Sequence, residues 1–314
     1  MVQAAVLGAL HNDMQNDLKP KLTASRVVFN LFNYTLFAIL LVLCIYPLWY
    51  VLIYAISDPD KTAVSPVFLL PQGLSLKSFE MVMSLKNVLP ALTVSIARTI
   101  VGTFCTVFAS MLLGYLFTKD AMPCRKLLYR ILIITMYISG GMIPTYLVYH
   151  AYGILNTFAA YIIPTIIAPY YVILVKTYIE QLPPSLEESA MIDGASPFTS
   201  FMRIIFPLSK PIVATISIYA AVGQWNSWFD NHIYTFNNKN LTTLQYLLYN
   251  YLNESERVLQ QIKASNADID TSGLLTPMGV RMTITVITLV PIMLVYPFLQ
   301  RYFMKGLLVG AVKG

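Results

Sequence analysis

The stretch from Val27 to Ser57 reads VVFNLFNYTLFAILLVLCIYPLWYVLIYAIS and contains no charged side chain. A helix needs about 20 predominantly apolar residues to cross a bilayer, so this run is long enough to span one with some tilt. The preceding residues 1–26 mix Asp, Asn and Gln and lack a compact apolar segment followed by a small-residue cleavage site. We therefore expect a retained N-terminal segment rather than a removable signal peptide. The run places the chain among integral membrane proteins.

The overall composition supports that class. Of the 314 residues, 57% are apolar and 11% are charged, and the mean hydropathy is +0.63. Soluble domains carry about a quarter charged residues, so these values exclude an ordinary soluble globule, and a chain this apolar does not stay disordered. The net charge of +6 does not indicate nucleic-acid binding, because the basic residues are scattered in short clusters between apolar runs.

Further apolar stretches follow along the chain, and together they predict an all-α integral membrane protein with six transmembrane helices between residues 27 and 300. Two of these stretches are interrupted by Gly140-Gly141, Pro144, Pro164 and Pro169. Such breaks free backbone groups that lipid cannot satisfy, so they usually face protein or a water-filled cavity. The expected spans are 27–57, 89–117, 127–148, 158–178, 211–229 and 280–299.

The basic residues predict the orientation of these spans. With both termini inside, the inner segments hold 12 Lys and Arg residues and the outer loops hold 6. The positive-inside rule therefore places residues 1–26 and the tail 301–314 in the cytoplasm.

The outer loops differ in length and character. Residues 58–88 contain three prolines and predict an irregular excursion with one short helix at 76–85. The loop 232–279 is longer, and apolar residues at helical spacing predict an interfacial or docking helix over 241–262. A loop of that size favours contact with a partner outside the membrane, although a solvated loop without a partner stays open.

The inner loop between the fourth and fifth spans, residues 183–211, predicts two short helices joined at a glycine. Ser185 is expected to cap the first helix, which ends near Asp193-Gly194. Ser196 is expected to cap the second, with Pro197 at its first position, and Pro207 is expected to break it after Ile205. A plain connection needs only a few polar residues, so an ordered and partly apolar element indicates a partner protein.

This loop resembles the EAA motif of the permease subunits of bacterial ABC importers. Glu188-Ser189-Ala190, Gly194 and Ile204-Ile205-Phe206-Pro207 follow the spacing E-A-A-x3-G-x9-I-x-L-P, with Ser189 and Phe206 as departures. Further segments resemble the carbohydrate-uptake branch, which includes the maltose permease, and within it the LplC- and YtcP-type permeases. They are Tyr46-Pro47-Leu48-Trp49, 140–146, 225–229 and the C-terminal tail.

The resemblance implies a type I ABC importer permease (MetI-like) fold in a bacterial cytoplasmic membrane, with the loop acting as coupling helices on a cytoplasmic ATPase. It implies a second related permease in a heterodimer, two ATPase subunits, an external solute-binding protein and surrounding lipid. The chain has no G-x4-G-K-[ST] motif, so ATP and Mg²⁺ are expected on the ATPase and no cofactor, metal or catalytic site on this chain. The expected coupling residues are Glu188, Ser189, Ala190, Met191, Ile192, Asp193, Gly194, Phe201 and Pro207.

Candidates for contact with cargo lie near the outer end of the fifth span and in the broken spans. Sugars are bound by aromatic faces and by side chains that donate and accept hydrogen bonds, which favours Trp225, Asn226, Trp228 and Asp230. An interfacial aromatic belt is the alternative for the two tryptophans. Arg98, at membrane depth, either pairs with Asp230 or meets an anionic cargo. Tyrosines that could line a pathway, or simply pack, are Tyr137, Tyr146, Tyr149, Tyr170 and Tyr171.

Other functions fit these features less well. A stand-alone secondary transporter suits kinked spans with a charge at membrane depth, but not the EAA-like loop. An importer for a solute other than a sugar also stays open. A membrane-embedded enzyme is disfavoured because the histidines His11, His150 and His232 lie far apart in the sequence.

Overall fold

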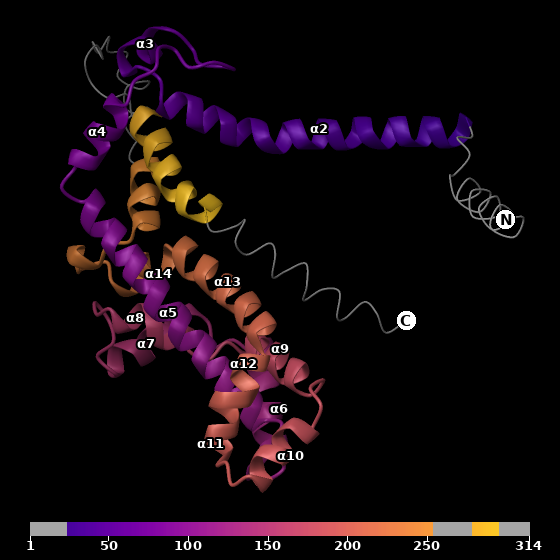
Figure 1. Cartoon of the computed structure of the whole chain (residues 1–314). Coiled ribbons are helices and arrows are strands. Elements are labelled where there is room, and N and C mark those ends of the chain that lie inside the picture. The colour runs from indigo at the N-terminus through magenta and orange to yellow at the C-terminus, as the bar shows by residue number, and fades with distance from the viewer. Residues whose placement is uncertain (1–23, 254–277, 295–314) are drawn as a thin grey trace, which may run out of the picture. The chain divides into compact units, whose positions relative to one another are not determined.

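The computed structural model describes residues 24–253 and 278–294, and it divides the chain into two units, 1–51 and 52–314 (Figure 1). The predicted tail 301–314, most of segment 1–26, the end of the sixth span and residues 254–262 of the predicted outer helix lie outside the described residues. The described residues contain helices and one isolated bridge between Ser57 and Leu74, and no strand.

Helix α2, Ala24–Ala55, begins in the first unit and contains the apolar run that decides the class. Its 32 residues are about 48 Å long, which exceeds the thickness of a bilayer core. Pro47 lies inside the helix without ending it. The first predicted span is confirmed as one continuous apolar helix.

The second unit is built around α5, Val88–Leu116, which packs against α9, Pro169–Ile179, and α13, Lys210–Asn226. Two glycines allow these close approaches. A Cβ atom at Gly102 would lie 2.5 Å from Nε2 of Gln224, and one at Gly114 would lie 2.5 Å from Cγ1 of Val175. A larger residue at Gly114 would press on Val175 and the backbone of α9, and one at Gly102 would displace the Gln224 side chain.

The third and fourth predicted spans are broken, as the glycines and prolines indicated. Helix α6, Arg125–Tyr137, is separated from α7, Met142–Ala151, by a segment that ends at Gly141 with φ +85°. Pro144 does not contribute to this break, because it lies in the first turn of α7, where its missing N–H has no intrahelical partner to lose. The fourth predicted span begins with α8, Ala159–Ile162, and the following turn η1, Ile163–Thr165. The chain then bends by 46° before α9.

The inner loop folds into α10, Ser185–Ile192, α11, Pro197–Ser200, the π-helical turn η2, Phe201–Ile205, and α12, Phe206–Leu208. Ser196 caps α11 as predicted, accepting a hydrogen bond from the Thr199 N–H. Ser185 is not a cap, because it is already the first helical residue and Pro184 precedes it.

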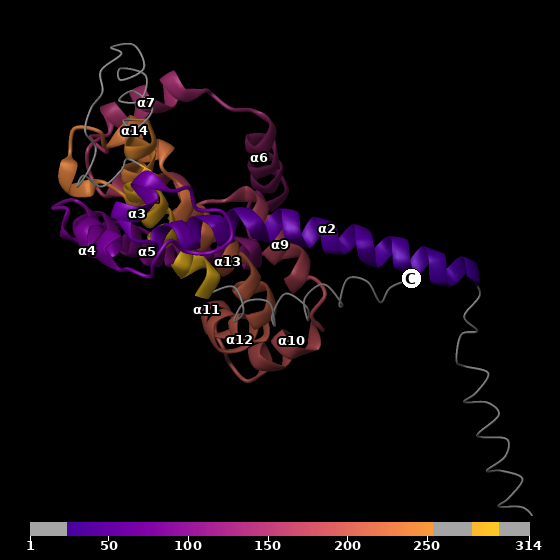
Figure 2. The same ribbon diagram turned by 90° about the horizontal axis from the view of Figure 1, so that it is seen from above.

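Pro207 does not break the second helix after Ile205, contrary to the prediction. The wide turn η2 interrupts the α-helical ladder, so Pro207 falls in the first turn of α12 and needs no hydrogen-bond donor there. The chain bends by 81° only after Leu208, where α13 follows. Both views show α10, α11 and α12 together at the end of α5 that lies opposite to α4 (Figures 1 and 2).

The segments predicted to be outer loops carry short helices: α3, Pro59–Val64, α4, Lys77–Ser84, α14, Phe229–Tyr234, and η3, Lys239–Leu241. A helix over 244–253 confirms the described part of the predicted outer helix. It packs with Trp225 and the helix Met278–Leu294 in one apolar core, while a second core joins α5, α9, η2 and α13.

Two of the described helices, α2 and α5, are long and apolar enough to cross a membrane. Two pairs of helices joined at the 46° and 81° bends could each count as one further span, which gives up to four in the described residues. The count of six spans and the orientation of the termini stay predictions.

Candidate functional site

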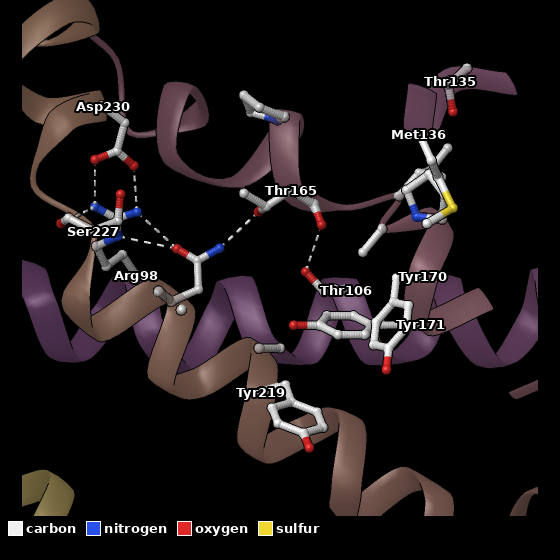
Figure 3. Close-up of a pocket in the computed structure, with 17 residues that line it drawn as sticks. Arg98, Thr106, Thr135, Met136, Thr165, Tyr170, Tyr171, Tyr219, Ser227 and Asp230 are labelled. Carbon is white, nitrogen blue, oxygen red and sulfur yellow. Dashed lines mark hydrogen bonds and ion pairs between the residues drawn. The ribbon is translucent and has the colours of Figure 1, made fainter. Parts of the chain in front are cut away.

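A cavity of about 590 Å³ lies in the second unit, with walls from α5, α6, α9, α13, α14 and the broken segment that precedes α9 (Figure 3). Its polar and aromatic lining residues include Arg98, Thr106, Thr135, Thr165, Tyr170, Tyr171, Tyr219, Gln224, Ser227 and Asp230. The cavity thus opens at the break in the fourth predicted span, where a pathway was expected.

Arg98 of α5 uses all five of its N–H groups in this wall. Nε and Nη2 donate to Oε1 of Gln224 at 3.1 and 3.0 Å. Nη1 and Nη2 donate to the two carboxylate oxygens of Asp230 at 3.2 and 2.5 Å, and Nη1 also donates to the Ser227 carbonyl at 3.3 Å. Arg98 is 1% exposed, and a charge buried this deeply is stable only when it is paired and fully hydrogen-bonded. The predicted pairing with Asp230 is confirmed.

Gln224 connects this ion pair to the broken segment. Its Nε2 donates to Oγ1 of Thr165 at 2.7 Å, and the Thr165 carbonyl accepts from Oγ1 of Thr106 at 2.9 Å. The Thr165 carbonyl, which Pro169 leaves without an intrahelical donor, therefore finds a partner on α5 rather than in lipid. One hydrogen-bonded chain crosses the wall from Asp230 to Thr106.

One face of the ion pair is covered by Tyr161 of α8. Its ring covers the Arg98 guanidinium at 4.4 Å, and its hydroxyl lies 2.6 Å from both Oγ1 of Thr235 and the Leu241 carbonyl. Farther out, burial and the Asp230 carboxylate raise the pKa of the Tyr234 phenol, which therefore stays neutral at physiological pH. The pair is shielded from the outer loop.

The other part of the cavity is aromatic, and we call Tyr170, Tyr171 and Tyr219 the tyrosine shelf. The Tyr171 and Tyr219 rings are nearly parallel, with centroids 6.4 Å apart, and Tyr170 lies 6.1 Å from Tyr171. In Figure 3 Thr165 lies between the Arg98–Asp230 pair and the rings of Tyr170 and Tyr171, and Tyr219 lies below them. The cavity therefore has a charged end that is internally paired and an aromatic end that is neutral.

A second candidate site is the coupling element, residues 185–208. Helix α10 ends in a Schellman motif: the Gly194 N–H donates to the Met191 carbonyl at 3.0 Å, and the Ala195 N–H donates to the Ala190 carbonyl at 2.9 Å. Gly194 has φ +84°, a conformation in which a side chain is strained. The predicted bend at this glycine is confirmed.

The element is anchored to the C-terminal end of α5. Glu187 forms an ion pair with Lys119, and its other carboxylate oxygen accepts a hydrogen bond from the Tyr115 hydroxyl at 2.6 Å. The Tyr115 ring packs on Phe201 with centroids 5.1 Å apart. Nothing in the sequence links Glu187 to Tyr115, which lies 72 positions away in the chain.

Residues 22–309 match the family model described as binding-protein-dependent transport system inner membrane component. The chain belongs to this family. It is 37% identical to the protein LplC of Bacillus subtilis over 86% of this chain and 90% of LplC. It is 31% identical to the polygalacturonan/rhamnogalacturonan transport system permease protein YtcP of the same organism, over 91% and 99% of the two chains.

A solved structure agrees with this membership. A bacterial ABC transporter involved in the import of the acidic polysaccharide alginate contains a chain that superposes with a TM-score of 0.81 at 25% identity, over 91% of this chain and all of that one. The chain thus has the MetI-like permease fold and is an inner-membrane transport component, and its relatives are transport permeases.

Of the ten residues predicted to contact cargo or line a pathway, four line the cavity: Arg98, Asp230, Tyr170 and Tyr171. Trp225 is buried and faces the helix Met278–Leu294, where its Nε1 donates to the Thr288 carbonyl at 3.0 Å. Successive residues of a helix point about 100° apart, so Gln224 turns toward α5 and the cavity while Trp225 turns away. Trp225 therefore lies outside the cavity lining in this structure.

The remaining five candidates also lie outside the cavity lining, namely Asn226, Trp228, Tyr137, Tyr146 and Tyr149. Trp228 stacks on Tyr249 with ring centroids 4.0 Å apart, and Asn226 accepts a hydrogen bond from Gln245 at 3.1 Å. Tyr137 is 83% exposed, although its neighbour Met136 lines the cavity, and Tyr146 is half-buried on α7. The sequence interpretation missed Gln224, Thr165 and Tyr219, whose residue types carry no signal for a site without the neighbouring helices.

The coupling residues of this permease divide into an outer surface and an inner anchor. Glu188, Ser189, Met191, Ile192, Asp193 and Pro207 are exposed, and Ala190 is half-buried. Phe201 is fully buried against Tyr115, so it holds the element from inside and does not present a docking surface.

Proposed function

We propose that this chain is the transmembrane permease subunit of an ATP-driven ABC importer for a carbohydrate, an oligosaccharide or polysaccharide fragment delivered by an external binding protein. The observation that carries the proposal is the coupling element, which is ordered, anchored to α5 and apolar on its exposed surface. Ile192 is 85% exposed, and further exposed apolar residues on the element are Leu186, Met191, Phe198 and Met202. Exposed apolar surface rimmed by Glu188 and Asp193 is typical of a protein-binding face.

The partner on this face is a cytoplasmic ATPase subunit that binds ATP and Mg²⁺, since the chain has no phosphate-binding motif of its own. Two such subunits, a second related permease and an external binding protein complete the importer. The carbohydrate cargo is supported by the polygalacturonan/rhamnogalacturonan permease YtcP and by the alginate transporter, both of which move sugar polymers or their fragments according to their names.

The anchor explains how movement of the element reaches the cavity. Along α5, Tyr115 at the element and Arg98 at the cavity are separated by about 25 Å of continuous helix. Helix α13 follows the element directly after the 81° bend and carries Tyr219 and Gln224 into the same wall. A displacement of the docked element therefore acts on both sides of the cavity through rigid helices.

The test is a charge reversal on the outer surface of the coupling element. We expect Glu188→Lys and Ile192→Asp to abolish co-purification of the ATPase and ATP-driven sugar uptake, while the permease still reaches the membrane. The control is Asp120→Lys, which reverses another exposed acid that pairs at 2.7 Å with Arg125. An exposed pair of this kind contributes about 0–1 kcal/mol, so uptake should persist in the control.

Two outcomes would contradict the proposal. Uptake that continues without any ATPase would identify a stand-alone secondary transporter. ATP-driven uptake that is unchanged in both element variants would show that this surface does not dock the ATPase.

A further inference from the structure

The charges that line the cavity neutralise each other. Among the described residues, Arg98 and Asp230 are the charged side chains in the lining, and they form a salt bridge with each other at 2.5 Å. The rest of the described wall is aromatic, aliphatic or hydroxylic. A cargo that enters from the membrane or from outside therefore meets a surface without a net charge.

Arg98 is not available as a receptor for an anion. A guanidinium has five N–H donors, and in Arg98 each of them is engaged by Gln224, Asp230 or the Ser227 carbonyl. One face of the guanidinium is also covered by Tyr161. A carboxylate on the cargo would have to displace Asp230, which would leave one of the two carboxylates desolvated without a partner.

The tyrosine shelf offers a different kind of contact. Tyr170 is 54% exposed and Tyr219 is 40% exposed, and both line the cavity. The face of an aromatic ring carries a partial negative charge. It therefore attracts the C–H groups of a sugar ring, whose hydrogen atoms are slightly positive. The hydroxyl of Thr165, already held between Gln224 and the backbone, marks the border between the shelf and the ion pair.

We propose that the tyrosine shelf is a cargo subsite of this chain that binds the face of an uncharged sugar ring, and that the paired Arg98 excludes uronate rings instead of attracting them. This inference rests on the proposed function and gives the substrate class of the cavity. It sets the chain apart from YtcP and from the alginate transporter, whose names denote acidic polysaccharides, so those names support a carbohydrate cargo but not its charge.

The experiment uses the complete importer in lipid nanodiscs without its binding protein, so that the permeases alone select the sugar. Equilibrium binding of maltotriose, raffinose and trigalacturonate is measured with radiolabelled sugars. We expect at least one neutral trisaccharide to bind, and trigalacturonate to bind at least about tenfold more weakly, because its carboxylates lose water without gaining a cation. Tyr170→Ala and Tyr219→Ala should each weaken the neutral sugar by about 5- to 10-fold, the range expected for one stacked ring.

Matched variants separate stacking from general damage. Tyr219→Phe keeps the ring and should bind the sugar as the wild type does. Tyr152→Ala removes an exposed tyrosine outside the cavity lining and should change nothing. A loss of binding in Tyr219→Phe would mean that the hydroxyl and not the ring makes the contact, and a loss in Tyr152→Ala would mean that removing a tyrosine damages the complex in general. Either loss would overturn the stacking argument.

Three results would overturn the inference without contradicting the proposed importer function. The first is binding of trigalacturonate that equals or exceeds binding of the neutral trisaccharides. The second is binding of the neutral trisaccharides that neither alanine variant weakens, and the third is no binding of any of the three sugars. The proposed function fails in another way, namely if the purified complex hydrolyses no ATP and ATP drives no sugar uptake in proteoliposomes. The two failures are therefore distinguishable.

Discussion

At the scale of single residues, the Arg98–Asp230 pair shows how a membrane helix carries a charge at low cost. Two ions taken out of water lose several kcal/mol of hydration each, and their attraction compensates only when the remaining hydrogen-bonding groups are satisfied. Gln224, Ser227 and the Tyr161 ring supply those contacts. The pair therefore ties α5 to α13 and α14 at the outer end of the cavity.

This role predicts the effect of removing one partner. Arg98→Met leaves the Asp230 carboxylate without its cation, so we expect the free energy of unfolding to fall by about 3–5 kcal/mol. In the double variant Arg98→Met with Asp230→Asn the unpaired carboxylate is also removed, so part of the lost free energy of unfolding should be restored. The measurement is unfolding of the purified complex in mixed micelles, titrated with SDS.

The control for this prediction is an exposed pair of the same chain. Lys77 lies 3.5 Å from Asp60, and both side chains are largely exposed. Lys77→Met should lower the free energy of unfolding by no more than about 1 kcal/mol. Equal effects of Arg98→Met and Lys77→Met would mean that burial does not strengthen the Arg98 pair.

At the scale of elements, the coupling element combines a rigid end with a wide turn. The Schellman motif at Gly194 sets the angle between α10 and α11. The π-helical turn η2 places Pro207 in a first helical turn, where the proline interrupts no helical hydrogen bond. Glu187, Tyr115 and Phe201 then fix the element to α5. Its exposed surface is thereby held at one defined orientation.

Two glycines with positive φ allow this geometry to be tested. Gly194, φ +84°, lies in the coupling element, and Gly153, φ +66°, lies in the loop after α7; neither has a neighbour within reach of an added Cβ. Gly194→Ala and Gly153→Ala should each cost about 1–2 kcal/mol of local backbone strain. We expect only Gly194→Ala to lower the rate of uptake per ATP hydrolysed, measured in proteoliposomes, because only that strain reorients the docking surface. A similar drop in Gly153→Ala would show that strain anywhere in the chain suffices.

At the scale of the whole molecule, the distribution of basic residues predicts an orientation that the described helices do not decide. Cys124 lies exposed before α6, in a segment expected to be cytoplasmic. In a chain with Cys44→Ser and Cys105→Ser, an impermeant maleimide should label Cys124 only after the cells are permeabilised.

The matched reporter for the outer side is Ser65, which is exposed in the loop 58–88. In the variant with Ser65→Cys and Cys124→Ser added to the same background, labelling should occur in intact cells. The reverse pattern for the two positions would invert the predicted topology.

Sequence patterns recovered the features that depend on neighbours along the chain. The break at Gly140-Gly141, the cap at Ser196 and the bend at Gly194 follow from residue types and their spacing, and all three are confirmed. Pro207 failed as a helix breaker because η2, a wide turn without a sequence signal of its own, had already interrupted the ladder before it.

The sequence by itself determined the membrane class, the main helices and the coupling element, because apolar runs, caps and glycines act within a few residues of themselves. The tertiary structure alone decided which side chains line the cavity. Asp230 meets Arg98 across 132 positions, and Gln224 rather than Trp225 faces that pair because adjacent residues of α13 point in different directions. The face that α13 turns toward α5, and the close contact at Gly102, are decided only when the two helices pack together. The sequence of one helix does not specify which residues of another helix it will contact.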